Sequence, residues 1–305
     1  MSDAPARVVA VVVTWNRRAL LTESLDALAA QTRPLDAVVV VDNASDDGTA
    51  QALAARSDVE VHTLTRNTGG AGGFAYGLAA ALRDDADLIW LMDDDTVPSA
   101  DALQALLDAR AGYPGDVAPA LVASRVVWTD GRAHPMNTPR PNPFARRAER
   151  VAADAVHCVP VRSASFVSVL VDAEVCKRRG APIADYFLWN DDFEFTTRLL
   201  RGNVGLLCPA SLVVHKTRTF GSTDADPGER FFFEVRNKIW LLTRSRSLAP
   251  VERLVYTAST LRRWARTITG SSDRGVLWRA LGRGLLAGVR RGPRPNKEVL
   301  AGVTA

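Results

Sequence analysis

Three adjacent aspartates, Asp93, Asp94 and Asp95, follow the apolar run Leu88–Met92. That run predicts a buried strand, so the carboxylates would stand at the end of a sheet, where they repel one another unless a cation compensates their charge. Oxygen ligands favour Mg²⁺ or Mn²⁺, which usually bind a few carboxylates together with substrate phosphates. A solvated turn ahead of a helix is the plainer alternative, but the apolar strand, which contains Trp90, favours a metal site.

A second acidic cluster, Asp191, Asp192 and Glu194, follows Trp189 and Asn190 in a segment predicted to open a helix. Carboxylates are stabilised at the beginning of a helix, so helix capping is one interpretation. The other is general base catalysis, in which one carboxylate near the metal site takes a proton from an acceptor hydroxyl. Asp192 and Glu194 cannot face the same way on a regular helix, so we expect their roles to differ.

Two further side chains stand at the ends of predicted strands. His215 closes the short strand Ser211–Val214, downstream of both acidic clusters, and a structural role and a metal-binding role both stay open for it. Asp42 ends the predicted strand Ala37–Val41. Its carboxylate could accept hydrogen bonds from a uracil or a ribose, or begin an Asx turn, and both can hold.

The stretch Gly69–Gly73 stands between a predicted strand and a predicted helix. Gly70, Gly72 and Ala75 match a loose dinucleotide fingerprint, which makes a nicotinamide-dependent dehydrogenase an alternative of another class. The match stands on the third predicted strand rather than the first, and its ribose-binding acid would be one of the three adjacent aspartates. We therefore interpret the glycines as positions where the backbone approaches a nucleotide-sugar. The sequence contains no P-loop phosphate motif, which excludes a P-loop nucleotidase.

Strands and helices alternate over the first 110 residues. The predicted strands are Val8–Val13, Ala37–Val41, Val59–Leu64 and Leu88–Met92. The predicted helices are Leu20–Gln31, Thr49–Ala55, Phe74–Leu82 and Ser99–Ala109. Repeated β-α-β units imply an α/β fold with a mostly parallel sheet and helices on both faces. Such sheets bind ligands at the carboxyl ends of their strands, which is where the acidic and glycine-rich motifs fall.

The rest of the chain is less regular. Residues 112–150 are rich in Pro, Arg and Asn and are predicted to form a long loop or lid. Beyond them we expect a strand over Ser165–Val171, short strands over Val204–Leu207 and Ser211–Val214, and helix from Glu229 onward. The chain is accordingly divided into a catalytic region, residues 1–220, and a basic helical region, residues 221–305, for contact with an acceptor or a membrane.

Composition limits the class of protein. The 305 residues are 47% hydrophobic and 24% charged, which excludes a disordered chain. The N-terminal apolar stretch is too short for a signal peptide. Cys158, Cys176 and Cys208 stand far apart, and their odd number and spacing argue against a disulfide framework or a zinc knuckle. A reducing cytoplasm is the expected location.

Charge is unevenly distributed along the chain. Residues 1–215 hold 20 Lys and Arg against 27 Asp and Glu, a net of −7, whereas residues 216–305 hold 18 against 7, a net of +11. The stretches Val251–Ile268 and Val276–Arg291 are basic and amphipathic, as in helices that lie on an anionic surface, with Trp264 expected at the interface. A solvated basic face is the plainer alternative. Nucleic acid is not an expected partner, because no helix-turn-helix or RNA-binding signature is present.

Four segments together resemble the family 2 glycosyltransferases, which have a GT-A (Rossmann-like) fold. They are Val11–Arg17, Val40–Ser45, Arg66–Phe74 and Trp90–Asp95, and the resemblance covers about residues 7–215. Within that family, the glycine-rich segment, the aspartate triplet and the Trp189–Glu194 segment resemble bacterial galactofuranosyltransferases. Chain length, Asp226–Phe232 and the Arg236–Asn237 pair further resemble the actinobacterial enzymes that start the cell-wall galactan on a polyprenyl-diphosphate-linked disaccharide.

The resemblance implies roles for individual residues. The implied metal ligands are Asp93, Asp95 and His215, holding Mn²⁺ or Mg²⁺. Asp192 would be the catalytic base, with Asp191, Glu194 and Trp189 binding or orienting the acceptor. The implied donor-binding residues are Thr14, Asn16, Arg17, Asp42, Arg66, Asn67, Gly70, Gly72, Asp93 and Asp94. Asn190 departs from the family pattern, in which Trp directly precedes the acids, so the choice between Asp191 and Asp192 as base stays open.

The implied reaction is metal-dependent, inverting transfer of a sugar in cell-wall or surface polysaccharide synthesis. UDP-galactofuranose is the expected donor and a polyprenyl-diphosphate-linked glycan the expected acceptor. Related rhamnosyltransferases, which use dTDP-sugars, share much of the pattern, and a sugar- or nucleotide-binding module without transferase activity is the non-enzymatic alternative. The basic region predicts peripheral association with the inner face of the cell membrane, an anionic surface. A homo-oligomer stays open.

Overall fold

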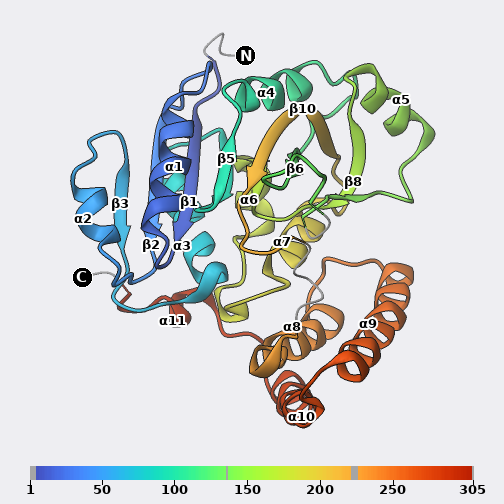
Figure 1. Cartoon of the computed structure of the whole chain (residues 1–305). Coiled ribbons are helices and arrows are strands. Elements are labelled where there is room, and N and C mark those ends of the chain that lie inside the picture. Colours follow the sequence, from blue (N-terminus) through green and yellow to red (C-terminus); the bar gives the residue numbers. More distant parts are fainter. Residues whose placement is uncertain (1–4, 135–136, 221–225, 304–305) are drawn as a thin grey trace.

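The computed structural model describes residues 5–134, 137–220 and 226–303 of the chain, and Figure 1 shows their arrangement. The strands are β1 (Val8–Thr14), β2 (Ala37–Asp42), β3 (Glu60–Thr63), β4 (Leu88–Asp93), β5 (Thr96–Pro98), β6 (Leu121–Val127), β7 (Arg140–Pro141), β8 (Val159–Ser163), β9 (Ser168–Asp172) and β10 (Gly205–His215). The helices are α1 (Arg18–Ala29), α2 (Thr49–Ala54), α3 (Gly69–Arg83), α4 (Ala102–Ala111), α5 (Arg147–Ala155), α6 (Ala173–Arg179), α7 (Asp191–Leu199), α8 (Phe231–Thr243), α9 (Pro250–Gly270), α10 (Arg274–Arg290) and α11 (Asn296–Val299).

The strands of the described residues form one sheet in the order β3-β2-β1-β4-β9-β6-β10-β8-β7, with β5 paired to β10 outside that order. Strands β3, β2, β1 and β4 pair parallel, as do β6 and β10, whereas β9 lies antiparallel between β4 and β6. Each β-α-β crossover returns the chain to the same end of the sheet, which makes the neighbouring strands parallel. The predicted α/β architecture with a mostly parallel central sheet is confirmed.

Strand β1 is buried along its whole length. Its side chains alternate between the two faces of the sheet, as strand geometry requires. Alternate residues from Val9 pack in a core cluster with α3, and alternate residues from Val8 pack in a second cluster with α1 and α4. Helices therefore cover both faces, as the unbroken apolar pattern of this strand predicts.

Helix α3 begins at Gly69, ahead of the predicted beginning at Phe74, so the glycine-rich stretch is helical rather than part of a loop. A Cβ atom at Gly73 would overlap the side chain of Val13, so the glycine lets α3 lie close to β1. Gly69 has a φ of +73°, and a Cβ there would overlap the backbone of Phe187. Close packing explains why this helix contains residues that weaken isolated helices.

The prediction of a long loop over residues 112–150 is wrong in part. Leu121–Val127 form β6, six of whose seven residues are buried, and Arg147–Ala155 form α5. The high Pro and Arg content of the segment obscured these shorter apolar patterns. Pro135 lies outside the described residues. The two short strands predicted over residues 204–214 form the single strand β10, with an irregularity between Cys208 and Leu212.

The C-terminal helices α8, α9 and α10 pack on one another below the sheet in Figure 1, around Phe231, Val235 and Trp264. The chain then returns to the edge of the sheet near β3, where Thr65 N donates to Val303 O at 2.7 Å. The predicted division between residues 220 and 221 falls at residues 221–225, outside the described part. In the described ranges, every helix is too short or too polar to cross a bilayer.

Candidate functional site

The predicted metal ligands meet at one edge of the sheet. Asp93 is the last residue of β4, and His215 is the last residue of β10. Strand β5 folds back antiparallel onto β10 and pairs Thr96 with His215, which brings the aspartates beside the histidine. One ligand atom from each of Asp93, Asp95 and His215 lies within 4.8 Å of the others. The topology thus brings His215 beside two aspartates that are far from it in sequence.

His215 is oriented by Asn137, a residue outside the predicted set. The Nδ1 atom of His215 lies 3.0 Å from Asn137 Oδ1, and because a carbonyl oxygen only accepts, Nδ1 carries a proton. Burial lowers the pKa of His215, but the contact of its Nε2 atom with Asp95 Oδ1, 2.9 Å away, raises that pKa overall. A divalent cation that displaced the Nε2 proton would find two ligand atoms here, which fits a metal site.

Burial and mutual repulsion make these carboxyl groups hard to ionise. Burial, reinforced by the charge of Asp95, raises the pKa of Asp93 to about 7. Burial also raises the pKa of Asp94 to about 6, against the opposing charge of Arg17. Burial acts in the same direction on Asp95, but its contacts with His215 and Arg17 hold the pKa below the ordinary value. A cation bound here would relieve the repulsion, which supports the fit of a divalent metal.

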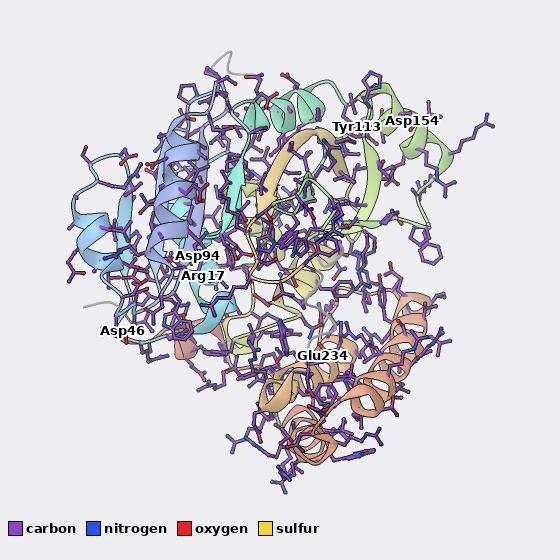
Figure 2. All side chains as sticks on the ribbon, in the orientation of Figure 1. Arg17, Asp46, Asp94, Tyr113, Asp154 and Glu234 are labelled. Atoms are coloured by element: carbon purple, nitrogen blue, oxygen red, sulfur yellow. The ribbon has the colours of Figure 1, made fainter. Side chains whose placement is uncertain are left out.

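Arg17 and Asp94 lie side by side at the end of β1 (Figure 2). Asp94 accepts hydrogen bonds from Thr14 Oγ1 at 2.8 Å and from Trp15 N at 3.3 Å, and Arg17 pairs with both Asp94 and Asp95. The side chain of Arg17 is 49% exposed and lines a surface pocket of about 370 Å³. A half-exposed guanidinium beside the acidic group can contact an anionic ligand such as a diphosphate.

Asp42 and Asn16 occupy the neighbouring strand ends. Asp42 is fully buried, and its Oδ1 accepts from Ser45 N at 3.0 Å, which is the predicted turn interaction. Its Oδ2 has no hydrogen-bond partner among the described residues, so it can accept from a ligand. Asn16 Oδ1 accepts from Asp46 N at 2.8 Å, which joins the loop after β1 to the loop after β2.

The predicted donor-binding residues before and within α3 have different surroundings. Asn67 Oδ1 accepts from Gly69 N at 2.7 Å, and Arg66 donates to Val299 O at 2.7 Å. The backbone of Gly72 lies against the side chain of Thr68. Nothing lies within 4 Å of a Cβ built on Gly70. Arg66, Asn67 and Gly72 thus have structural partners, whereas Gly70 faces open space.

The second acidic cluster lies at the beginning of α7, near the first. Burial and the charges of Asp192 and Asp93 raise the pKa of Asp191 well above its ordinary value. Burial also raises the pKa of Asp192, but the charges of Lys238 and Arg140 oppose that shift. The charge of Asp93 contributes to the raised pKa of Asp191, so the two acidic clusters lie near enough to interact electrostatically.

Glu194, two residues further along α7, forms hydrogen bonds with other side chains of the protein. It is 1% exposed and accepts hydrogen bonds from Arg198 Nε at 2.9 Å and from Ser245 Oγ at 2.6 Å. The predicted difference in role from Asp192 agrees with this placement. Since its carboxylate is engaged with neighbouring side chains, the geometry favours positioning of α7 over direct contact with an acceptor.

Helix α8 holds the turn before α7, a role that sequence reasoning missed. Phe187, Trp189 and Asn190 have φ of 63°, 64° and 66°, in the left-handed region that costs about 1 kcal/mol or more for such residues. The buried Asn237 places its Nδ2 2.8–2.9 Å from the carbonyl oxygens of Tyr186, Leu188 and Trp189. Glu234 accepts from Asn190 Nδ2 at 2.7 Å. The polar residues Arg236 and Asn237 in a stretch rich in aromatic and aliphatic residues were the available signal.

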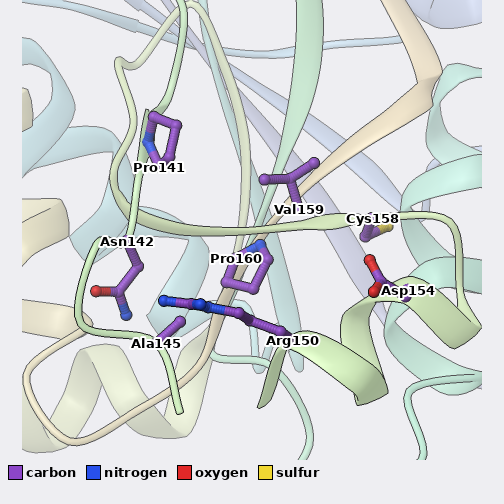
Figure 3. Close-up of a pocket in the computed structure, with 8 residues that line it drawn as sticks. All are labelled: Pro141, Asn142, Ala145, Arg150, Asp154, Cys158, Val159 and Pro160. Atoms are coloured by element: carbon purple, nitrogen blue, oxygen red, sulfur yellow. The ribbon is translucent and has the colours of Figure 1, made fainter. Parts of the chain in front are cut away.

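Another surface pocket, of about 300 Å³, lies between β7, α5 and β8 (Figure 3). Arg150 extends across it and donates to Pro143 O at 3.3 Å. None of the predicted site residues lines this pocket, so it contributes nothing to the chemistry described above.

Comparison with known proteins gives consistent results. The model of the family described as glycosyl transferase family 2 matches residues 9–170. The chain is 32% identical over 255 residues to galactofuranosyltransferase GlfT1 of Mycobacterium tuberculosis (strain ATCC 25618 / H37Rv), which covers 78% of this chain and 82% of that protein.

Two solved structures share the fold. S. aureus TarS in complex with UDP matches with a TM-score of 0.63 and 17% identity, over 92% of this chain and 80% of that chain. Mannosyltransferase PcManGT from Pyrobaculum calidifontis in complex with GDP-Man and Mn²⁺ matches with a TM-score of 0.54 and 21% identity, over 98% of this chain and 79% of that chain. At these identities the likeness concerns the fold alone.

Proposed function

The chain belongs to glycosyl transferase family 2 and is a glycosyltransferase with a GT-A fold, and from that premise we propose that it transfers galactofuranose from UDP-galactofuranose to a lipid-linked glycan. The observation that carries the proposal is the meeting of Asp93, Asp95 and His215 at one edge of the sheet. One site then provides cation ligands, a basic contact for a diphosphate and a general base. The similarity to GlfT1 supports galactofuranose as the sugar.

The donor would lie over the ends of β1, β2 and β4. The unpartnered Oδ2 of Asp42 can accept a hydrogen bond from uracil or ribose, and Gly70 leaves room for the donor to approach the backbone. Arg17 faces the pocket where a diphosphate would bind. A divalent cation held by Asp93, Asp95 and His215, either Mn²⁺ or Mg²⁺, would offset the charge that develops on the departing diphosphate.

The acceptor hydroxyl would be deprotonated by a carboxylate at the beginning of α7. Asp192 or Asp191 takes the proton as the hydroxyl oxygen attacks the anomeric carbon from the face opposite the leaving nucleotide, so the configuration inverts. A raised pKa suits a group that must accept a proton near neutral pH. Trp189, held by α8 in the turn before this pair, is placed to contact the acceptor sugar, while Glu194 holds the helix.

Transfer assays with the purified chain test the sugar and the metal. With Mn²⁺ and a short-chain polyprenyl-diphosphate-linked disaccharide, we expect product from UDP-galactofuranose and none from dTDP-rhamnose. Chelation should abolish transfer, and Mn²⁺ or Mg²⁺ should restore it. Transfer from dTDP-rhamnose instead would make the chain a rhamnosyltransferase, and full activity in chelator would exclude the metal-dependent reaction.

Substitution of each carboxylate identifies the base. Asp192→Asn should leave the donor dissociation constant near that of the wild type and lower kcat by about 10²–10⁴, because only proton removal is lost. Asp191→Asn is compared in the same assay, and the base is the residue whose loss removes turnover at unchanged donor affinity. Asp154→Asn, an exposed aspartate away from both clusters, is the control. Full kcat in both variants would exclude a carboxylate base at this helix.

We further propose that α9 and α10 bring the enzyme to an anionic membrane surface, where a lipid-linked acceptor resides. Leu254 and Leu261 of α9 and Trp278 of α10 are 73%, 58% and 60% exposed. Arginines interleave with these apolar side chains on both helices, which suits anionic head groups. The expectation that Trp264 lies at the interface is wrong, because this side chain is buried and donates to Glu234 at 3.2 Å.

A further inference from the structure

Two cations flank one aromatic ring directly after the Asp191–Asp192 pair. The Nζ atom of Lys238, on α8, lies 4.8 Å from the centroid of the Phe193 ring. The guanidinium carbon of Arg140, on β7, lies 5.3 Å from the same centroid. Elements that are far apart in sequence thus bring two positive charges together beside the proposed base.

Lys238 is a buried ammonium without a counter-ion. The residue is only 7% exposed, and no carboxylate of the described ranges lies within ion-pair distance of its Nζ. Burial, together with the charges of Arg263 and Arg140, lowers the pKa of Lys238 to about 8. Arg140 likewise makes no ion pair or side-chain hydrogen bond with the described residues. Holding an unpaired cation in such a place destabilises the chain unless a ligand supplies the anion.

Glu234 and Asp192, the acidic residues whose charges act on Lys238, already have other hydrogen-bond partners. Glu234 accepts from Asn190, pairs with Arg263 and accepts from Trp264 Nε1. Asp192 accepts from the backbone N of Phe193 at 2.6 Å. Their charges act on Lys238 from a distance, but neither forms an ion pair with it. The positive charge of Lys238 and Arg140 therefore remains available.

We propose that Lys238 and Arg140 bind a phosphate or diphosphate group of the acceptor, an inference that rests on the proposed function. Arg and Lys are the side chains that recognise phosphate oxygens. Both cations lie against Phe193, the residue directly after Asp191 and Asp192, and neither belongs to the group formed by Asp93, Asp95 and His215. The proposed anion site is therefore distinct from the candidate metal site.

Two acceptors that differ only in charge test this site. One is the glycan on a short prenyl diphosphate, and the other is the same glycan as a neutral alkyl glycoside. For Lys238→Met and Arg140→Met we expect kcat/KM for the diphosphate acceptor to fall about tenfold or more, mainly through KM, since each loses a contact to a charged group. The ratio of kcat/KM between the two acceptors should fall accordingly. Arg83→Met, at an exposed arginine at the end of α3, is the matched control.

An equal fall with both acceptors would overturn the inference, because it would mean that the cations act on Asp192 or on folding. Lys238→Arg keeps the charge and should restore most of the preference, and the exposed Arg140 gives a second variant with little risk to folding. Calorimetric titration with inorganic pyrophosphate in chelator tests binding without turnover, in a background of Arg17→Met that removes the proposed donor-side contact. We expect binding to the Arg17→Met protein that adding either Lys238→Met or Arg140→Met weakens, and equal binding to all three proteins would also overturn the inference. Wild-type protein that binds pyrophosphate but transfers sugar to neither acceptor would contradict the proposed function instead.

Discussion

Asp93 and Asp94 sit at the end of β4 in a place where a negative charge is costly. Burial is the first cause of that cost, and it raises the pKa of these groups to about 7 and about 6. The ordinary value of an aspartate is near 4. These groups lie at the edge of the sheet where we propose that a ligand binds. A cation bound there would offset the electrostatic cost of the buried carboxylates.

In chelator, we expect the free energy of unfolding to fall as the pH rises from about 5 to about 7. Over this window the folded chain holds protons on Asp93 and Asp94 that the unfolded chain has already released, so each step upward in pH favours unfolding. Groups with a lowered pKa, such as Asp58 and Glu252, act in another pH range. They stabilise the folded chain throughout this window, and that contribution is lost only as the pH falls below it. Urea unfolding at a series of pH values measures the slope.

Two conditions should flatten that slope. Asp93→Asn removes one of the carboxyl groups with a raised pKa, and saturating Mn²⁺ binds the ionised form and so stabilises the folded state at the upper end of the window. If the slope were the same in wild type, in Asp93→Asn and with Mn²⁺, burial of these carboxyl groups would not be its cause.

The meeting of the candidate metal ligands could be predicted from strand ends. Asp93 and His215 end apolar strands, Asp95 follows two residues after Asp93, and strand ends of one sheet meet at one edge. Asn137 could not be predicted, because its hydrogen bond to His215 spans 78 positions of the chain and has no local pattern. The position of Lys238 beside Phe193 could not be predicted either, because the sequence shows only one basic residue among many in the basic region.

At the scale of elements, the turn between η1 (Ala184–Tyr186) and α7 depends on α8. Its left-handed residues would relax in isolation, since bulky side chains disfavour that conformation. Asn237 and Glu234 hold the turn through its carbonyl oxygens and through Asn190. The carboxylates that we propose as the base therefore take their position from the C-terminal region of the chain.

Asn237→Ala should lower kcat by up to about 10²-fold, because small displacements of catalytic groups have effects of that size. Steady-state kinetics measures kcat, and protease cleavage near Trp189 should become faster as the turn opens. Asn203→Ala removes a side chain that donates to one carbonyl at the other end of α7, and it serves as the control. Unchanged kcat in a folded Asn237→Ala variant would contradict the role of α8.

The glycines of α3 allow a paired test of packing. Gly73→Ala should destabilise the fold by about 1–3 kcal/mol, because its Cβ would overlap Val13 of β1. Gly70→Ala should not destabilise it, since nothing lies within 4 Å and alanine favours helix. Urea unfolding compares the two. If Gly70 lies under the donor as proposed, Gly70→Ala raises the donor KM despite its intact stability, and equal losses of stability would refute this packing.

Helices and strands could be predicted where the apolar pattern of the sequence was strong. The prediction failed where the composition of the surrounding segment concealed that pattern. The parallel strands β1, β2 and β4 have continuous β-branched or apolar runs. Strand β6 has a similar run, but it lies in a segment whose prolines and arginines are typical of loops. The helical state of Gly69–Gly73 depends on contacts with β1 and the Phe187 turn, which no local pattern contains.

At the scale of the whole molecule, charge separates the chain into two parts that contact each other closely. The acidic part carries the proposed donor site, and the basic part holds the turn before α7 and then returns to the sheet near β3. The sequence indicated the basic helices, and their anionic partner stays a prediction. The return of the chain depends on pairs such as Thr65 with Val303, which only the folded topology brings together.

The exposed apolar side chains of α9 and α10 make the proposed membrane contact testable apart from catalysis. Replacing Leu254 and Leu261 with serine should weaken sedimentation with anionic vesicles by about tenfold or more, because each leucine contributes about 1.5–3 kcal/mol when buried. Val117→Ser, at an equally exposed position outside these helices, should have no effect. Binding should fall with salt, since arginines interleave with the leucines.

Transfer to a short soluble acceptor should be unaffected, because these side chains lie outside the catalytic site. Equal binding to neutral and anionic vesicles would exclude the electrostatic contact, and binding that survives the double substitution would exclude this face of α9 as the membrane contact.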